Sequence, residues 1–145
     1  MVEKALLATD IVVFNGSHVL LIKRKNPPWQ GYYALPGGLV NKDETVIDAA
    51  KRELEEETGV KATDLKEIDV YSTPGRDPRG RVVSFAFTTK VNNPEPELKA
   101  ADDALEAKWF PTEKLPELAF DHKEIIKDAL KIKDNNNSNN NNNIT

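Results

Sequence analysis

The segment that decides the fold and the chemistry of this chain runs from Gly38 to Val60 and reads GLVNKDETVIDAAKRELEEETGV. Within it, three acids are spaced i, i+3 and i+4: Glu53, Glu56 and Glu57. On a helix, this spacing places three carboxylates on one side. Such a cluster is unfavourable by itself and strongly favourable around a hard divalent cation. The segment therefore predicts a metal site, and the Gly37-Gly38 turn beside it suggests phosphate chemistry.

The composition is that of a soluble globular domain: 145 residues, of which 39% are hydrophobic and 30% charged. No apolar run approaches the length of a membrane span, and the N-terminus lacks a signal-peptide pattern. Cysteine is absent, which excludes disulfides and Cys-ligated zinc. These facts favour a cytoplasmic protein without a membrane partner. The net charge of -4 argues against a nucleic-acid partner, yet a bound metal would still admit an anionic small substrate.

Hydrophobic patterning and turn signals divide the chain into strands and two helices. The strands are expected at residues 5–14, 19–23, 32–35, 65–72, 82–91 and 106–110, and the helices at 45–58 and 121–132. Thr45 and Asp121 are the expected N-caps, and Gly59 is a suitable stop. The Asn-rich segment 134–145 is expected to be a disordered tail on a domain of residues 1–133. The order of elements predicts an α/β/α sandwich.

The helix expected at 45–58 has an apolar face and a charged face. At about 100° per residue, the apolar face comprises Val46, Ile47, Ala50 and Leu54. On the charged face, Asp48 with Arg52 and Lys51 with Glu55 form i, i+4 pairs of opposite charge, which are typical of solvated helices. We therefore expect the apolar face to pack on the sheet and the charged face to meet solvent.

The remaining acids of this helix fall between those two faces. Glu53 and Glu57 lie at the edge of the buried stripe, with Glu56 just outside them. Carboxylates about 5 Å apart at an effective dielectric of ~20 repel by roughly 3 kcal/mol, and a cation reverses the sign of that energy. A Glu-rich solvated helix is the alternative, but the edge placement favours a metal. Oxygen ligands suit Mg²⁺ or Mn²⁺ better than zinc.

These positions complete a known pattern. The segment 38–60 resembles a Nudix box, Gly-x5-Glu-x7-Arg-Glu-U-x-Glu-Glu-x-Gly-U with U a bulky aliphatic residue, at every specified position. The resemblance implies hydrolysis of a nucleoside diphosphate linked to another group, and a Nudix-type α/β/α sandwich with a mixed β-sheet. It also implies metal binding by Glu53, Glu56, Glu57 and the Gly38 carbonyl. Glu44 is expected to pair with Arg52 and to orient the helix.

Residues beyond the box narrow the resemblance. The stretches 70–74 and 76–80, with Pro74 at its distance past the box, are similar to ADP-ribose pyrophosphatases, as are 109–110 and 118–122. The resemblance implies that water attacks a phosphorus of ADP-ribose and yields AMP and ribose 5-phosphate. It also suggests a homodimer. The alternatives are a Nudix hydrolase of another nucleotide, a non-catalytic domain that senses ADP-ribose, and a binding or structural domain with a Glu-rich helix.

The sequence leaves more than one candidate for the general base. We expect His18 to be a solvated hairpin residue and His122 to be structural, which leaves carboxylates. In related enzymes the base or a further metal ligand comes from a later loop, where the candidates are Asp102, Asp103 and Glu106. Glu53 or Glu56 would serve instead.

Substrate contacts are expected from cationic and aromatic residues. Four arginines would bind phosphate or ribose: Arg24, Arg76, Arg79 and Arg81. Two aromatic residues, Trp29 and Tyr33, would stack on adenine. The alternative for each is core packing or simple solvation.

Overall fold

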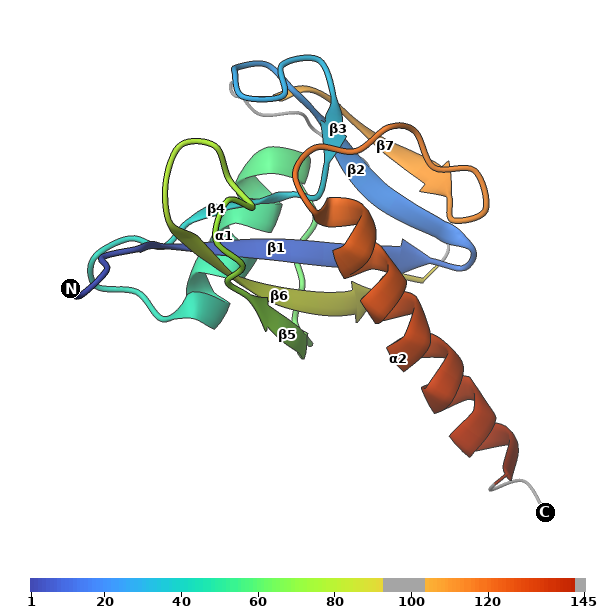
Figure 1. Cartoon of the computed structure of the whole chain (residues 1–145). Coiled ribbons are helices and arrows are strands. Elements are labelled where there is room, and N and C mark those ends of the chain that lie inside the picture. The colour runs from blue at the N-terminus through green and yellow to red at the C-terminus, as the bar shows by residue number, and fades with distance from the viewer. Residues whose placement is uncertain (93–103, 143–145) are drawn as a thin grey trace.

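The computed structural model describes residues 1–92 and 104–142, with side chains described for 1–92 and 106–135. The elements follow in the order β1 (Leu6–Asn15), β2 (His18–Arg24), β3 (Tyr33–Ala34), β4 (Gly37–Leu39), α1 (Val46–Thr58), β5 (Lys66–Tyr71), β6 (Val82–Lys90), β7 (Ala104–Pro111) and α2 (His122–Asn142). Figure 1 shows β1 through the middle of the molecule, with α1 behind the sheet and α2 in front. Two helices therefore enclose a sheet, as the expected sandwich requires.

Strand β1 is the centre of the sheet. It pairs in parallel with β6 over its length, from Leu6 opposite Val82 to Phe14 opposite Lys90. It pairs antiparallel with β2 at the hairpin end and with β4 near its start. Among the described residues, the strand order is β3-β2-β1-β6-β5, with β4 on β1 and β7 on β2. Both pair types occur, which confirms the predicted mixed sheet.

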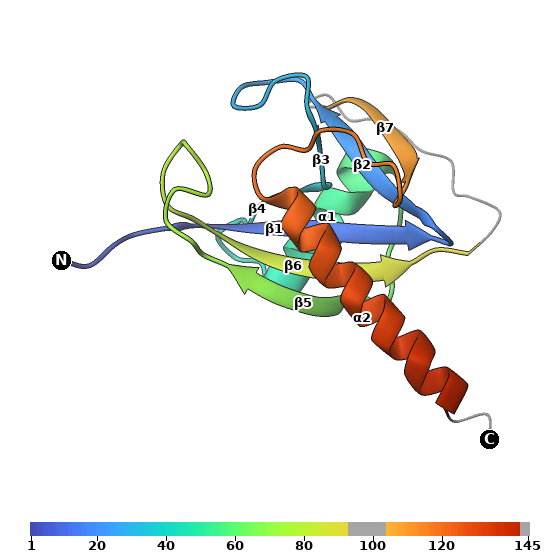
Figure 2. The same ribbon diagram turned by 45° about the vertical axis from the view of Figure 1, so that its right-hand side comes forward.

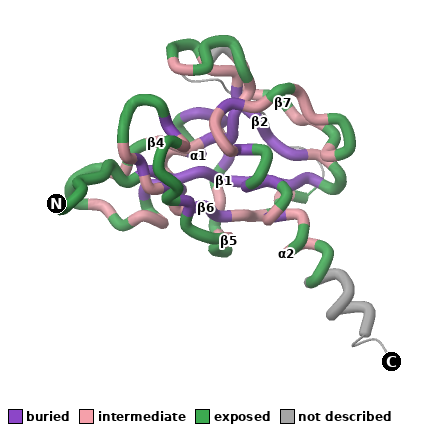
Figure 3. Tube along the Cα trace, in the orientation of Figure 1, coloured by how far each residue is buried: buried purple, intermediate pink, exposed green. Residues whose placement is uncertain are grey.

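The core lies on both faces of the sheet because β1 and β2 alternate. Val12 and Phe14 pack with Ile125 and Ile126 of α2 on one face. The next cluster, on the α1 face, comprises Ile11, Val13, Leu20, Ala50, Leu54, Val60 and Phe87. Figure 3 shows the buried positions concentrated along β1, β2 and β6, while the loops are largely exposed. Period-two alternation thus supplies two apolar surfaces, each covered by one helix.

Helix α1 begins and ends where the sequence predicts. The Thr45 hydroxyl accepts a hydrogen bond from the backbone N–H of Asp48 at 3.2 Å, the N-cap interaction. Gly59 takes the left-handed conformation (φ 79°) and its N–H donates to the Glu55 carbonyl. These caps fix the register of the helix, and therefore the direction in which each acid points.

Strand β4 was not predicted, because two consecutive glycines carry little strand propensity. It forms because β1 provides a partner: Thr9 lies opposite Gly38, and Asp10 opposite Gly37. A Cβ on Gly37 would collide with the Thr9 carbonyl, so only glycine allows the two backbones this close approach. Strand β7 also begins two residues earlier than expected.

Helix α2 differs from its expected end at residue 132 and continues to Asn142. The backbone of residues 134–142 prolongs the helix started by the packed residues Ile125 and Ala129, and the Asn-rich tail from residue 134 stays a prediction. Figures 1 and 2 show the C-terminal part of α2 extending past the sheet. The domain boundary at residue 133 stays a prediction. Among the described residues, no helix has the length and apolarity to cross a membrane.

Candidate active site

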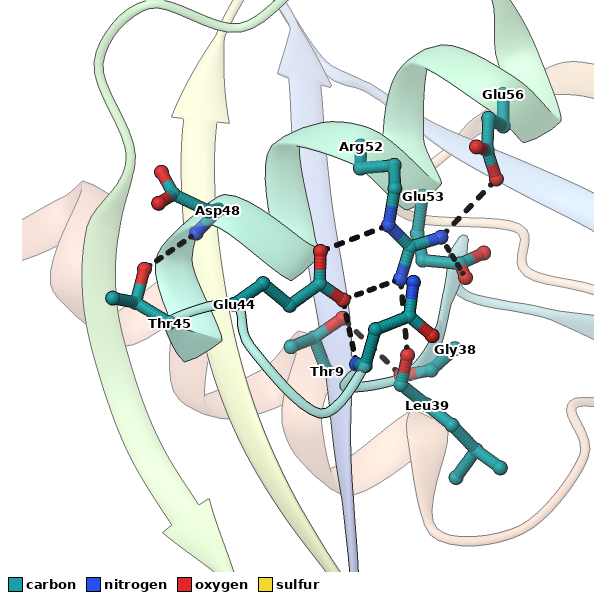
Figure 4. A network of polar contacts seen from close by, with 10 residues as sticks. Thr9, Gly38, Leu39, Glu44, Thr45, Asp48, Arg52, Glu53 and Glu56 are labelled. Carbon is teal, nitrogen blue, oxygen red and sulfur yellow. Dashed lines mark hydrogen bonds and ion pairs between the residues drawn. The ribbon is translucent and has the colours of Figure 1, made fainter.

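Arg52 is the centre of the polar network on α1 (Figure 4). Its Nε and one terminal nitrogen donate to the two carboxylate oxygens of Glu44, at 3.0 and 2.6 Å. This bidentate bond, with a further one from the Asn41 N–H, lowers the pKa of Glu44 to about 2. The expected Glu44–Arg52 pair is thus present. The expected surface pair between Asp48 and Arg52 is wrong, because Arg52 turns toward Glu44 instead.

The same guanidinium contacts two of the predicted metal ligands. Its other terminal nitrogen lies 2.7 Å from Glu53 Oε1 and 3.2 Å from Glu56 Oε2. The nitrogen that binds Glu44 also donates to the Leu39 carbonyl at 3.1 Å. Arg52 therefore offsets the repulsion between the acids and ties α1 to β4.

Glu57 lies on the other side of this network. Its side chain is buried, with the residue 4% exposed, and its Oε2 accepts a hydrogen bond of 3.4 Å from the Gly37 N–H. Glu55 instead has a 54% exposed side chain and lies 3.9 Å from Lys61. Helical phase thus separates a buried acid from a solvated one within three consecutive glutamates, as the sequence predicts.

The Gly38 backbone lies directly against Glu53. An added Cβ at Gly38 would lie 2.5 Å from the Glu53 carboxyl carbon, so the acid fills the space a side chain would need. The Gly38 carbonyl accepts a long hydrogen bond of 3.5 Å from the Thr9 hydroxyl. A carboxylate and a backbone carbonyl therefore lie side by side.

This donor set has the chemistry that a hard cation needs. Carboxylates and a carbonyl are the oxygen ligands that Mg²⁺ and Mn²⁺ prefer. Across residues 1–92 and 104–142, no three acids or histidines are gathered closely enough to hold an ion as they stand. The reason is that Glu53 and Glu56 face Arg52, while Glu57 faces Gly37. The assignment of the metal ligands therefore stays a prediction that the donor chemistry fits.

A cleft of about 290 Å³ opens beside these residues. Its wall includes the backbone of Gly37 and Gly38 together with Glu57. It also includes six side chains from elsewhere in the chain: Asp10, Arg24, Arg76, Arg79, Phe120 and His122. The cleft therefore brings two of the four expected metal ligands, Gly38 and Glu57, and a group of cations to one surface.

Asp10 and His122 form a buried pair at this cleft. The Leu35 N–H donates to His122 Nδ1 at 3.0 Å, which leaves the proton on Nε2, 3.3 Å from Asp10 Oδ1. His122 thus joins the start of α2 to Asp10 on β1 and to the backbone of Leu35. This is the structural role expected of it. Asp10 was missed, although an acid inside an apolar strand pattern is the signal that would have found it.

The predicted substrate arginines have different surroundings. The Arg76 side chain is 6% exposed and donates to both oxygens of Asp121, at 2.8 and 2.7 Å, and to Ser84 Oγ at 2.9 Å. Burial alone would lower the pKa of Arg76, but Asp121 raises it above its ordinary value. Asp121 lies at the start of α2, but its carboxylate binds Arg76 and does not cap the helix as expected.

Arg79 is half exposed and pairs with the buried Asp77, 2.8 Å away. Burial would raise the pKa of Asp77, but hydrogen bonds from Arg79 outweigh it and hold that pKa below its ordinary value. Arg24 donates from Nε to the Pro28 carbonyl at 2.8 Å. Both arginines line the cleft, whereas Arg81 is not among the described residues that do.

Three other predicted site residues, Trp29, Tyr33 and Glu106, have contacts with neighbouring side chains instead. The Tyr33 hydroxyl donates to Glu106, which raises the pKa of Tyr33 to about 12, and the ring packs edge-on against Phe110. Trp29 packs against Tyr32 and is partly exposed. None of Trp29, Tyr33 and Glu106 is among the described residues of the wall. Asp102 and Asp103 lie outside the described residues.

Comparison with known proteins places this geometry in context. The family described as NUDIX domain matches residues 4–129. An ADP-ribose pyrophosphatase of Methanocaldococcus jannaschii is 48% identical over 128 residues, which cover 88% of this chain and 75% of the relative. The ADPR responsive transcriptional repressor NtrR of Acinetobacter baylyi is 30% identical over 142 residues, 90% of this chain and 55% of the relative.

A solved structure shares the fold closely. The NUDIX domain of Shewanella oneidensis NrtR complexed with ADP ribose superposes with a TM-score of 0.81 at 28% identity, covering 90% of this chain and 89% of that one. The arrangement of sheet and helices described above is therefore found in a domain with a bound nucleotide sugar.

Proposed function

The chain belongs to the Nudix family, and from this premise we propose that it is a metal-dependent pyrophosphohydrolase that converts ADP-ribose to AMP and ribose 5-phosphate. The observation that carries the proposal is that Glu57, the Gly37–Gly38 backbone and the cations Arg24 and Arg79 line one cleft. The relative named ADP-ribose pyrophosphatase, 48% identical, supports the choice of substrate.

In the proposed reaction, the oxygen of a water molecule bonds to one phosphorus and the bridging P–O bond breaks. Glu53, Glu56, Glu57 and the Gly38 carbonyl would hold Mg²⁺ or Mn²⁺. When bound, such a cation neutralises charge on the diphosphate and makes water more acidic. In the free chain Arg52 pairs with Glu53 and Glu56, and its bond to Glu44 ties the loop before α1 to the helix.

The water must lose a proton to a base. The candidates remain Asp102, Asp103, Glu106, Glu53 and Glu56. The Glu106 carboxylate accepts the Tyr33 hydroxyl through Oε1 and is not among the described residues that line the cleft. This position favours an acid of the box over Glu106.

The arginines at the cleft would bind the charged and planar parts of the substrate. Arg24 and Arg79 reach the cleft with guanidinium groups that Pro28 and Asp77 hold in place. Arg76, saturated by Asp121 and Ser84, would act mainly by fixing the cleft wall. We also propose a homodimer in the cytoplasm, which light scattering and cell fractionation would test.

The decisive experiment is turnover of ADP-ribose by the purified full chain with Mg²⁺, Mn²⁺ or EDTA, with the products identified by chromatography. An oxidised nucleoside triphosphate, a dinucleotide polyphosphate and NADH serve as competing substrates. We expect AMP and ribose 5-phosphate to form only with metal. ADP-ribose turnover no faster than that of the other nucleotides would refute the substrate assignment.

Two variants of one helix make a matched pair for this assay. Glu57→Gln removes the buried charge without changing the shape, and we expect kcat to fall by about 10³-fold or more because the loss of a metal ligand removes electrostatic stabilisation. Glu55→Gln removes a solvated charge two residues away and should leave kcat unchanged. Equal kcat in the two variants would argue against Glu57 as a metal ligand, whereas no turnover even by the wild type would argue for a binding or structural domain.

A second candidate function is ADP-ribose sensing without turnover. The observation that favours it is the 30% identity to a protein named an ADPR responsive transcriptional repressor. Tight binding of ADP-ribose by calorimetry, with no products in the presence of either metal, would select this function.

A further inference from the structure

Phe120 has a backbone conformation that needs an explanation. Its φ angle of 54° lies in the left-handed region, which residues other than glycine, asparagine and aspartate rarely adopt. Such conformations persist where the surrounding structure fixes them, and they concentrate at functional sites. Phe120 is half-buried and lines the cleft.

The residues after Phe120 are what fix it. Asp121 accepts two hydrogen bonds from Arg76, and His122 bridges the Leu35 N–H and Asp10. The side chains of Asp121 and His122 are thus bound to two different parts of the fold. The left-handed turn at Phe120 is the consequence, and it directs the Phe120 side chain into the cleft.

Two guanidinium groups lie over the Phe120 ring. The guanidinium carbons of Arg24 and Arg79 are 5.0 and 5.6 Å from the ring centroid, within cation–π range. Trp29 approaches the same ring with a centroid distance of 6.3 Å. The three side chains Arg24, Phe120 and Arg79, called here the stacked group, come from three separate segments of the chain.

The hydrogen bonds of the two arginines determine what they offer a ligand. Arg79 gives its Nε and one terminal nitrogen to Asp77, and Arg24 gives its Nε to Pro28. These bonds fix the planes of both guanidinium groups, which lie over the Phe120 ring. Flat aromatic bases stack on the faces of planar cations.

We propose that the stacked group is the subsite for the purine base, with Phe120 as the specificity-determining residue. This inference rests on the proposed function, because it requires a nucleotide substrate whose diphosphate lies at Glu57 and Gly38. It places the AMP half of ADP-ribose, and not the terminal ribose, against Arg24, Phe120 and Arg79.

Calorimetric binding of the two products tests the assignment, since AMP carries the base and ribose 5-phosphate does not. The proteins are the wild type, Phe120→Leu, which keeps bulk and removes the ring, and Arg79→Lys, which keeps charge and removes the plane. Tyr32→Leu is the control, because Tyr32 is exposed, lies near Trp29 and is outside the described cleft wall. We expect the Kd of AMP to rise about 10-fold in both test variants and to be unchanged in the control.

The Kd of ribose 5-phosphate should change less than about 2-fold, because no base is stacked. For ADP-ribose turnover, KM should rise while kcat is largely kept. Unchanged AMP binding in both variants, or weaker binding of ribose 5-phosphate alone or of both products equally, would overturn the inference. If Phe120→Leu fails to fold, Arg79→Lys decides, because that side chain is 54% exposed. Wild-type protein that binds AMP but leaves ADP-ribose intact would refute the proposed hydrolysis and not the subsite.

Discussion

The Glu53 carboxylate occupies the space over Gly38 in which a side chain would begin. A Cβ there would lie 2.5 Å from Glu53 Cδ and 2.7 Å from each carboxylate oxygen. The glycine at the first position of the box is therefore needed to admit an acid beside a backbone carbonyl. A side chain at position 38 would displace only the flexible end of Glu53, so it should affect activity more than folding.

Gly38→Ala should fold but lose activity. Glu53 can swing away at little cost in stability, but it then leaves its place beside the Gly38 carbonyl. We expect kcat/KM for ADP-ribose to fall by roughly 10- to 100-fold. Gly16→Ala is the reverse control: Gly16 has a φ of 57° in the hairpin, so alanine there should cost about 1 kcal/mol of stability and leave kcat/KM unchanged. Thermal melts and steady-state kinetics of both variants check this, and a Gly38→Ala enzyme with full activity would contradict it.

The Glu44–Arg52 bond should make stability depend on pH in a defined acid window. The folded pKa of Glu44 is lowered from 4.5 to about 2, so the folded state holds the ionised form more strongly than the unfolded chain does. The stabilisation is fully present above pH 4.5 and is lost as the pH falls toward 2. Urea unfolding of wild type and Glu44→Gln across this range should show a constant difference at neutral pH that vanishes within the window. A difference that is undiminished at pH 2 would rule out this origin.

The Arg76–Asp121 pair should be strongly coupled. Arg76 is nearly buried, so removal of either partner leaves a poorly solvated charge and should destabilise the fold by on the order of 3 kcal/mol. A double-mutant cycle with Arg76→Ala and Asp121→Ala, followed by chemical denaturation, should give a coupling energy of about 2 kcal/mol. The matched surface pair, Lys61 and Glu55 at 3.9 Å, should give less than about 0.5 kcal/mol. Similar coupling in the two pairs would contradict this reading.

Tyr33 should ionise near pH 12. Its hydroxyl donates to Glu106, and loss of the proton would break that bond and oppose two negative charges, so the pKa rises from its ordinary value of 10. The difference in tyrosinate absorbance between wild type and Tyr33→Phe isolates this titration. Glu106→Gln should move the midpoint back toward 10, and a wild-type midpoint already at 10 would show that the bond is absent in solution.

Local pattern predicted the parts of the molecule that depend on residues a few positions apart. Helix α1 was predicted from its apolar period together with the caps Thr45 and Gly59. The separation of Glu55 from Glu57 followed from the same helical phase. Strands β1 and β2 were predicted because β-branched runs flank an Asn-Gly turn.

Other features depended on partners that are distant in the chain. Arg52 had an acid four residues before it, Asp48, yet it binds Glu44, because the loop before the helix brings that carboxylate within reach. Strand β4 exists only because β1 lies beside it. Arg76 was expected to bind substrate, but its partner Asp121 is 45 residues away and occupies its donors.

The sequence by itself determined the family, the sandwich and the acids of the box, since these rest on spacing along one helix and on strands that alternate residue by residue. Only the tertiary structure decided which side chains line the cleft. Phe120, Arg24 and Arg79 come from segments with no common period, and they meet because Asp121 and His122 are bound to different parts of the fold. Contacts of this kind depend on how the whole chain packs, and they cannot be predicted from the residues next to each partner in the sequence.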